Sequence, residues 1–170
     1  MKSVGTNEYA PGSRLSGLAL QLVLEFFEGT LQEVVKLAVF IPLVIGTGGN
    51  TGAQAATTVT RALAVGEVRF DDLAVVVLRE ARVGFLLGLG LGLLALGPAV
   101  LFAGTGIAIV VSITLLAVCT LAAIVGSLLP LVARRVGVDP AVMSAPFITT
   151  LVDATGLVVY FLVARAVLRL

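Results

Sequence analysis

The chain has 170 residues, 59% of them hydrophobic and only 12% charged, and its mean hydropathy is +1.14. Because an average soluble domain is about a quarter charged, this composition excludes an ordinary soluble protein and predicts one domain embedded in a lipid bilayer. A formal net charge of +1 gives no basis for a nucleic-acid partner, and the absence of histidine excludes histidine metal sites and Ser-His or Cys-His catalysis. We therefore predict an all-α integral protein of the cell membrane that is not an enzyme.

The N-terminal end of the chain divides into a tail and a short apolar stretch. Residues 1–13 are polar and rich in Gly, Ser and Pro, which predicts a tail ahead of a membrane domain over residues 14–170. The first apolar run, residues 15–24, has only ten uncharged residues before Glu25. Since a helix needs about 20 residues to cross a bilayer, the first of the predicted spans is short.

The second predicted span, residues 37–60, is apolar but rich in helix-weakening residues. Pro42 lacks a backbone donor, and residues 46–52 contain four glycines in seven positions. This predicts a second helix that is broken at the Gly-rich segment, a feature tolerated inside a membrane only against protein or water. Asn50 and Gln54 recur at helical spacing, so the segment predicts a polar pore or cavity lining. The alternative is that the glycines allow tight helix packing.

Residues 83–133 carry no charge over 51 positions, which predicts two spans joined by a short turn within residues 97–106. The first of these spans has glycines at every fourth position, a pattern suited to close helix contact: Gly84, Gly88 and Gly92. Just before it, Glu80 stands between Arg79 and Arg82 and predicts a local ion pair at the membrane interface.

The last predicted span, residues 140–164, has Asp153 as its only charged residue. A helix of this length measures about 37 Å, which places Asp153 near the bilayer midplane. A charged aspartate there costs at least about 2.5–3.5 kcal/mol, so it needs a partner or a function. Thr149 lies on the same face, and a carboxylate with hydroxyl and carbonyl oxygens suits hard cations such as Mg²⁺ or Ca²⁺. The alternative is a neutral Asp153, or one paired with Asn50, Gln54 or Arg61.

Five spans place the two termini on opposite sides of the membrane. With a cytoplasmic N-terminus, eight of the eleven Lys and Arg residues lie on the cytoplasmic side. Because positive charge favours cytoplasmic loops, we expect this orientation.

Three motifs resemble the membrane domain of the MgtE family of magnesium channels and transporters. They are IPLVIGTGGNTGAQ over residues 41–54, LPLVARRVGVDP over residues 129–140 and APFITTLVDATGL over residues 145–157. The resemblance implies a five-helix domain that forms a homodimer, with a pore at the dimer axis lined by the second and fifth helices. It also implies that Asp153 is the principal Mg²⁺ site, with Asn50, Gln54 and Thr149 as further candidate ligands.

The function expected from this resemblance is conduction of hydrated Mg²⁺ down its electrochemical gradient. Mn²⁺, Co²⁺ and Ca²⁺ are further candidate ions that the sequence does not rank. Two alternatives stay open at this point: a structural membrane subunit without transport, and an exchanger that couples divalent cations to H⁺ or Na⁺. Members of the family usually carry a cytosolic helical domain and paired CBS domains; these 170 residues contain neither, which leads us to expect a minimal member or a fragment.

Overall fold

The computed structural model describes residues 11–33, 35–140 and 145–170, and within these ranges the chain is helical without strands. The elements in chain order are α1 (Pro11–Phe26), α2 (Glu28–Glu33), the 3₁₀ helix η1 (Val35–Phe40), α3 (Ile41–Ala64), the 3₁₀ helix η2 (Phe70–Asp72), α4 (Leu73–Ala103), α5 (Thr105–Arg135) and α6 (Ala145–Leu168). The predicted tail, residues 1–13, falls mostly outside the described residues.

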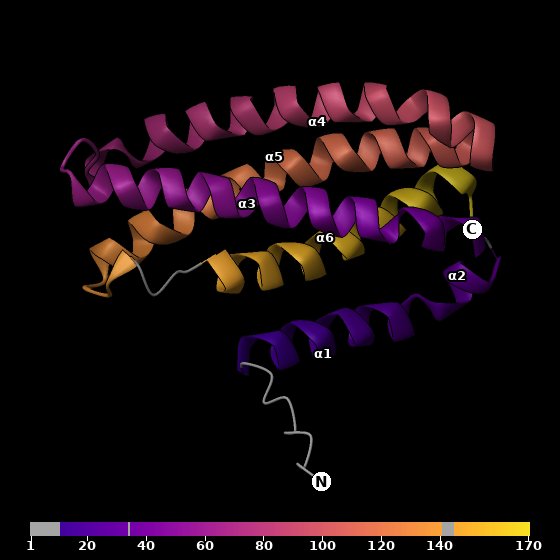
Figure 1. Cartoon of the computed structure of the whole chain (residues 1–170), viewed down its shortest axis with the longest axis horizontal. Helices are drawn as coiled ribbons and strands as arrows, with labels where there is room; N and C mark the ends of the chain where they lie inside the picture. The colour runs from indigo at the N-terminus through magenta and orange to yellow at the C-terminus, as the bar shows by residue number, and fades with distance from the viewer. Residues whose placement is uncertain (1–10, 34, 141–144) are drawn as a thin grey trace, which may run out of the picture.

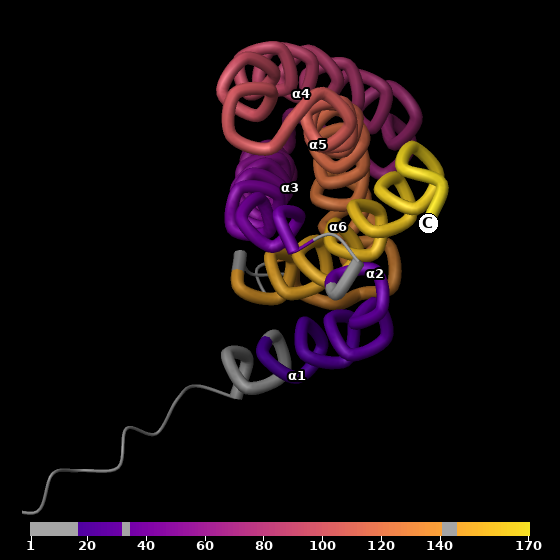
Figure 2. The backbone as a smooth tube through the Cα atoms, turned by 90° about the vertical axis from the view of Figure 1, so that its right-hand side faces the viewer, coloured from indigo at the N-terminus to yellow at the C-terminus, as the bar shows by residue number. Residues whose placement is uncertain are grey.

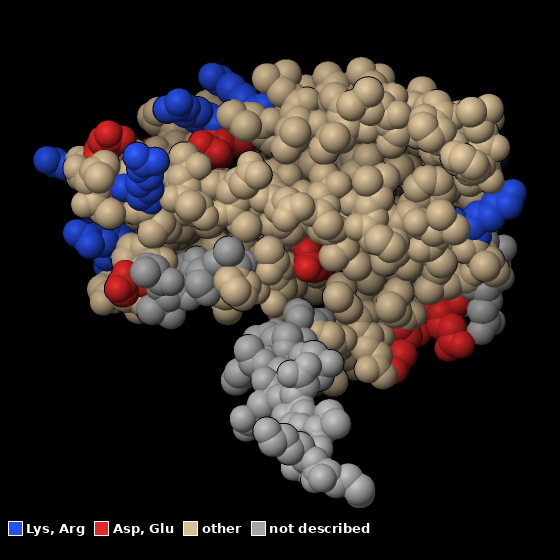
Figure 3. Space-filling view, viewed as in Figure 1, with Lys and Arg blue, Asp and Glu red and all other residues tan. Residues whose placement is uncertain are grey.

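Four helical segments are long and apolar enough to cross a membrane: Val35–Ala64, Phe70–Ala103, Thr105–Arg135 and Pro146–Leu168. A fifth apolar stretch, Gly17–Phe26 in α1, is shorter. Charged side chains gather at the two ends of the bundle, and the surface between the ends is uncharged apart from one acidic side chain (Figure 3). The all-α membrane fold is therefore confirmed, while the count of five crossings and the cytoplasmic N-terminus stay predictions.

The long helices pack side by side with α5 at the centre (Figure 1). Helix α5 contacts α3, α4 and α6, whereas α4 packs along α5 and α1 packs along α6. Viewed along the bundle, α4 and α1 lie on opposite sides of the other helices (Figure 2). The surfaces of α4 and α1 that face outward are accordingly rich in exposed apolar side chains.

Glycines bring α4 and α5 into close contact, as the spacing predicts. A Cβ atom built on Gly84 would lie 2.5 Å from the carbonyl oxygen of Cys119, and one on Gly92 would lie 2.9 Å from that of Ser112. The Ser112 hydroxyl donates a hydrogen bond of 2.9 Å to the Gly92 carbonyl oxygen. Small residues and an interhelical hydrogen bond of this kind are the usual means of helix association in membranes.

Helix α3 is continuous from Ile41 to Ala64, so the predicted break at residues 46–52 is wrong. Pro42 lies in the first turn, where the missing backbone donor has no helical partner to lose. A glycine costs a helix about 1 kcal/mol relative to alanine but does not forbid it. Here Gly48, Gly49 and Gly52 are buried, because they let α5 and α6 approach α3 closely. The tight-packing alternative therefore accounts for these three glycines.

The turn predicted within residues 97–106 is confined to Gly104, which joins α4 directly to α5. Gly104 has a φ of 94°, a value that glycine adopts without steric cost. Pro98, which we expected in the turn, lies inside the last part of α4. A proline there removes one helical hydrogen bond, which a membrane helix tolerates.

Aromatic residues in the second half of α6 pack against Phe27 and η1, which precede α3 in the chain. The Phe27 and Phe161 rings stack with their centroids 4.9 Å apart. The buried Tyr160 hydroxyl donates a 2.9 Å hydrogen bond to the carbonyl oxygen of Leu37 in η1. These contacts hold the first half of α3 against α6, where the candidate site lies.

Candidate ion site

Asp153 lies in the middle of α6, half-buried against α3. Its Oδ1 atom is buried and has no hydrogen-bond partner among the described residues. It faces Gly49 of α3, where a Cβ atom would lie only 2.6 Å from Oδ1. Only glycine leaves room for the carboxylate at this point, so the sequence of α3 makes the space that Asp153 occupies.

Thr149 faces the same glycine from one turn earlier on α6. Its Cγ2 atom would lie 3.4 Å from a Cβ atom on Gly49. The Thr149 hydroxyl donates a 3.0 Å hydrogen bond to the carbonyl oxygen of Pro146, within its own helix. The structure therefore brings Asp153 and Thr149 together, as the sequence predicts for one helical face.

Asn50 and Gln54 lie on an exposed face of α3 rather than in contact with the carboxylate oxygen. With Ala53, Thr57 and Thr58 they line an open hollow of about 340 Å³. Both threonine hydroxyls donate to carbonyl oxygens one turn back, Thr57 to Ala53 at 2.8 Å and Thr58 to Gln54 at 2.9 Å. This face of α3, which we call the polar face, consists of Asn50, Ala53, Gln54, Thr57 and Thr58.

The alternative in which Asp153 is paired with a neighbour has no support at Oδ1. This atom accepts no hydrogen bond from Asn50, Gln54 or Arg61. Within the ranges that the structure describes, no three His, Cys, Asp or Glu side chains come close enough to hold a metal ion. One copy of the chain thus offers a single carboxylate, together with hydroxyl, amide and carbonyl oxygens. These are ligands for a hard cation that keeps much of its water, and they do not suit a soft metal.

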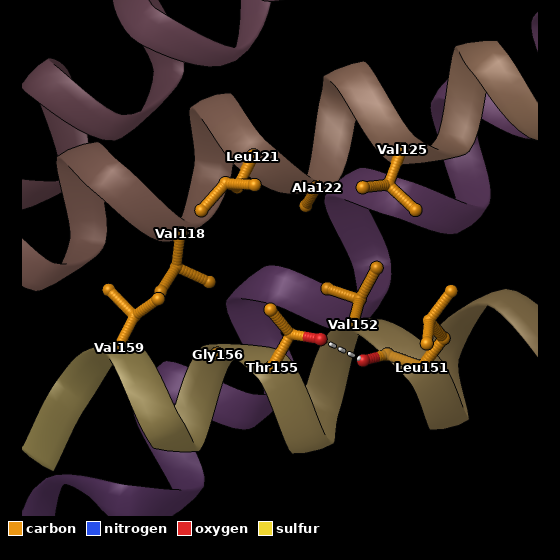
Figure 4. A pocket seen from close by; sticks show the side chains of 9 residues that line it. All are labelled: Val118, Leu121, Ala122, Val125, Leu151, Val152, Thr155, Gly156 and Val159. Atoms are coloured by element: carbon orange, nitrogen blue, oxygen red, sulfur yellow. Dashed lines mark hydrogen bonds between the residues drawn. The ribbon is translucent and has the colours of Figure 1, made fainter.

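The side of α6 that faces α5 has a different character. There an apolar pocket lies between the two helices, lined by residues such as Val118, Val152 and Val159 (Figure 4). Thr155 also lines it, but its hydroxyl donates a 2.8 Å hydrogen bond to the carbonyl oxygen of Leu151. The polar groups suited to an ion therefore lie on the side of α6 that faces Gly49.

Gly49 is the residue of the site that the sequence did not single out. Close packing accounts for Gly48 and Gly52, whose Cβ atoms would meet side chains of Val118, Val152 and Ile148. Gly49 follows Gly48 directly, and two adjacent buried glycines can face two different neighbours. The adjacent glycines are the sequence feature that could have indicated this, since Gly48 packs against α5 and Gly49 accommodates the carboxylate of α6.

Known proteins resemble this chain over most of its length. The sequence profile described as "MgtE: Divalent cation transporter" matches residues 41–163. The chain is 42% identical over 155 residues to the magnesium transporter MgtE of Thermus thermophilus, covering 91% of this chain and 34% of that protein. It is 33% identical over 154 residues to the magnesium transporter MgtE of Enterococcus faecalis, covering 90% of this chain and 34% of that protein. It thus spans about a third of the length of the curated relatives it matches.

Proposed function

Because this chain belongs to the MgtE family of divalent cation transporters, we propose that it passes Mg²⁺ through the membrane at Asp153. The observation that carries the proposal is the buried, unpartnered Oδ1 of Asp153 beside Gly49. An unpaired carboxylate in a membrane span is costly, and such residues typically mark ion pathways. A passing cation supplies the partner that the described residues do not.

The pore lies at the axis of a homodimer, between the polar faces of two copies. Two facts about one copy support this. Its site has a single carboxylate, and the polar face of α3 is exposed although α3 belongs to a membrane-crossing segment. Amide and hydroxyl groups avoid hydrocarbon, so a second copy that covers this face and leaves water between the helices is favourable. Asn50, Gln54 and Thr149 then contribute oxygen ligands around the ion.

Mg²⁺ fits this arrangement because it sheds water reluctantly and is usually held by one or two carboxylates. Two Asp153 side chains facing each other across the axis would hold a hydrated ion without stripping its shell. Mn²⁺, Co²⁺ and Ca²⁺ accept the same oxygen ligands, so the flux assay below includes each of them.

The orientation proposed for the domain has the N-terminus on the cytoplasmic side, with α1 as a fifth crossing. The end of the bundle at which α3 and α5 finish is rich in arginine: Arg61, Arg69, Arg79, Arg82, Arg134 and Arg135. The opposite end has Lys36, Arg165 and Arg169. The excess of positive charge at the first end supports its placement in the cytoplasm.

The test is Mg²⁺ influx into liposomes that contain the purified chain and a Mg²⁺-sensitive dye. We expect Asp153→Ala and Asp153→Asn to reduce influx to the level of empty liposomes. The matched control is Asp71→Asn, which removes an exposed carboxylate of η2, ahead of α4, and leaves influx unchanged. Influx of the Asp153→Ala protein at the parent rate would refute the site. Loss of parent influx when the H⁺ or Na⁺ gradient is collapsed would instead support the coupled exchanger.

A further inference from the structure

Two arginines of α4 have no partner in the structure. Arg79 and Arg82 are exposed, and neither takes part in a hydrogen bond or ion pair with any described residue. The expected local ion pair with Glu80 is therefore absent from the described part of the chain. Helix α4 packs mainly along α5 and lies on the opposite side of the bundle from α1 (Figure 2). Lysine or arginine side chains lie over the first part of α4 (Figure 3).

The contacts between α4 and α5 fix the height of these arginines, by which we mean their position along the long axis of the bundle. Gly84 of α4 meets Cys119 and Ala123 of α5, and Gly92 meets Ser112, so the two helices run antiparallel in a regular register. Arg82, two residues before Gly84, thus lies at about the height of residues 121–123.

The contacts between α6 and α5 fix the height of Asp153 in the same way. Gly156 meets Val118, and Gly106 meets Leu168, so these helices are also antiparallel. Asp153, three residues before Gly156, lies at about the height of Leu121. Arg82 and Asp153 are therefore within about one helical turn, or about 5 Å, of the same height on opposite sides of the bundle.

The apolar length of α4 explains how an exposed arginine reaches this height. The uncharged part of α4, residues 83–103, is about 32 Å long, close to the hydrocarbon thickness of about 30 Å. On α4 the hydrocarbon region thus fits between Gly104 and Arg82. Side chains of a helix tilt toward its N-terminus, so both guanidinium groups extend away from the apolar part.

We propose that Arg79 and Arg82 bind the phosphate of an anionic phospholipid on the arginine-rich side of the membrane. Guanidinium groups bind phosphate in bidentate fashion, and no carboxylate in the described ranges competes for these two. Val83, Leu86 and Leu93 continue the same face of α4, and they are 53%, 66% and 64% exposed. This apolar strip lies where the acyl chains of the same lipid would run.

The experiment uses a fluorescent reporter beside the two arginines. The chain has no tryptophan, so Phe85→Trp, at a position that is 46% exposed one turn from Arg82, gives a single signal. The protein is reconstituted in phosphatidylcholine vesicles that contain brominated phosphatidylglycerol or, at equal fraction, brominated phosphatidylcholine. We expect phosphatidylglycerol to bind at least about fivefold more strongly, the preference that one arginine near an anionic headgroup provides.

Two double variants separate this site from a general effect of charge. Arg79→Gln with Arg82→Gln should abolish the preference, whereas Arg69→Gln with Arg134→Gln removes the same charge at the same end and should retain it. Should the first variant fold poorly, Arg79→Lys with Arg82→Lys keeps both charges and should keep most of the preference. Equal quenching by the two lipids in the parent protein, or equal loss in both glutamine variants, would overturn the proposal. Competition by soluble glycerol phosphate would also overturn it, because the ligand would then be free phosphate.

Discussion

Replacing Gly49 by alanine tests the geometry of the candidate site without removing any of its ligands. The new Cβ atom would lie 2.6 Å from Oδ1 of Asp153 and 3.4 Å from Cγ2 of Thr149. The carboxylate would have to withdraw by about 0.8 Å to reach an ordinary contact distance. Because the carboxylate is the free end of a side chain, it can move while the α3 and α6 backbones stay in place. The substitution should therefore displace the ligand more than it disturbs the fold.

The expected effect on stability is small because two contributions oppose each other. Alanine gains up to about 1 kcal/mol over glycine within a helix. Overpacking a tight contact costs about 1–3 kcal/mol. We expect the free energy of unfolding to fall by no more than about 2 kcal/mol. Mg²⁺ influx should fall by about tenfold, as it would if the ion site lost about 1.4 kcal/mol of binding free energy.

Gly52→Ala is the matched control, since it makes the same change one turn further along α3. Its Cβ atom would lie 3.0 Å from Val152 Cγ2 and 3.2 Å from Ile148 Cγ2, away from the carboxylate. Both variants are compared by thermal unfolding in detergent and by dye-detected Mg²⁺ influx into liposomes. We expect similar melting temperatures and an influx defect confined to Gly49→Ala.

Two results would refute this reasoning. One is parent-level influx of the Gly49→Ala protein, which would mean that the position of the carboxylate does not matter. The other comes from the variant that combines Gly49→Ala with Asp153→Ala. Removing the carboxylate leaves room for the methyl group, so Gly49→Ala should cost less stability in this background than in the parent. An equal cost in both backgrounds would show that the methyl group meets something else.

Two further predictions concern the packing that holds the site. Gly126→Ala places a Cβ atom against the backbone carbonyl of Gly52, which cannot give way, so we expect the unfolding free energy to fall by more than about 3 kcal/mol. The control is Gly90→Ala, whose Cβ atom meets nothing within 4 Å. Equal melting temperatures of the two variants would contradict the close contact at Gly126. Tyr160→Phe leaves the buried carbonyl of Leu37 without its donor and should cost about 1–3 kcal/mol in the same melting assay, whereas an unchanged melting temperature would mean that the hydrogen bond is not formed.

The features that could be predicted from the sequence are those that depend on local pattern. Long uncharged runs gave the apolar spans, and the spacing of Gly84, Gly88 and Gly92 gave the close contact of α4 with α5. Asp153 could be identified as a candidate because a lone carboxylate in an apolar run is costly wherever its helix packs. Each of these features can be recognised without knowing which helices are neighbours in the fold.

The features that could not be predicted depend on tertiary contacts. Four glycines in seven residues indicate a weak helix, yet the close approach of α5 and α6 compensates for that weakness and keeps α3 continuous. Likewise, the position of Asp153 opposite Gly49 depends on the register between α3 and α6, which no local pattern specifies. The separation of Asn50 and Gln54 from the carboxylate oxygen has the same origin, since helical spacing orders residues only within one helix.

The hydroxyl groups of the polar face have a consequence for the sign of the charge they attract. Thr57 and Thr58 each use their only proton within α3, in hydrogen bonds to the carbonyl oxygens one turn back. What such a hydroxyl presents to the hollow is a pair of lone electron pairs and no donor. An anion beside these two hydroxyls would find no proton to share, whereas a cation or the water around it would find acceptors; the amide groups of Asn50 and Gln54 are the donors of this hollow. At the two threonines the surface therefore favours a cation without any charged side chain.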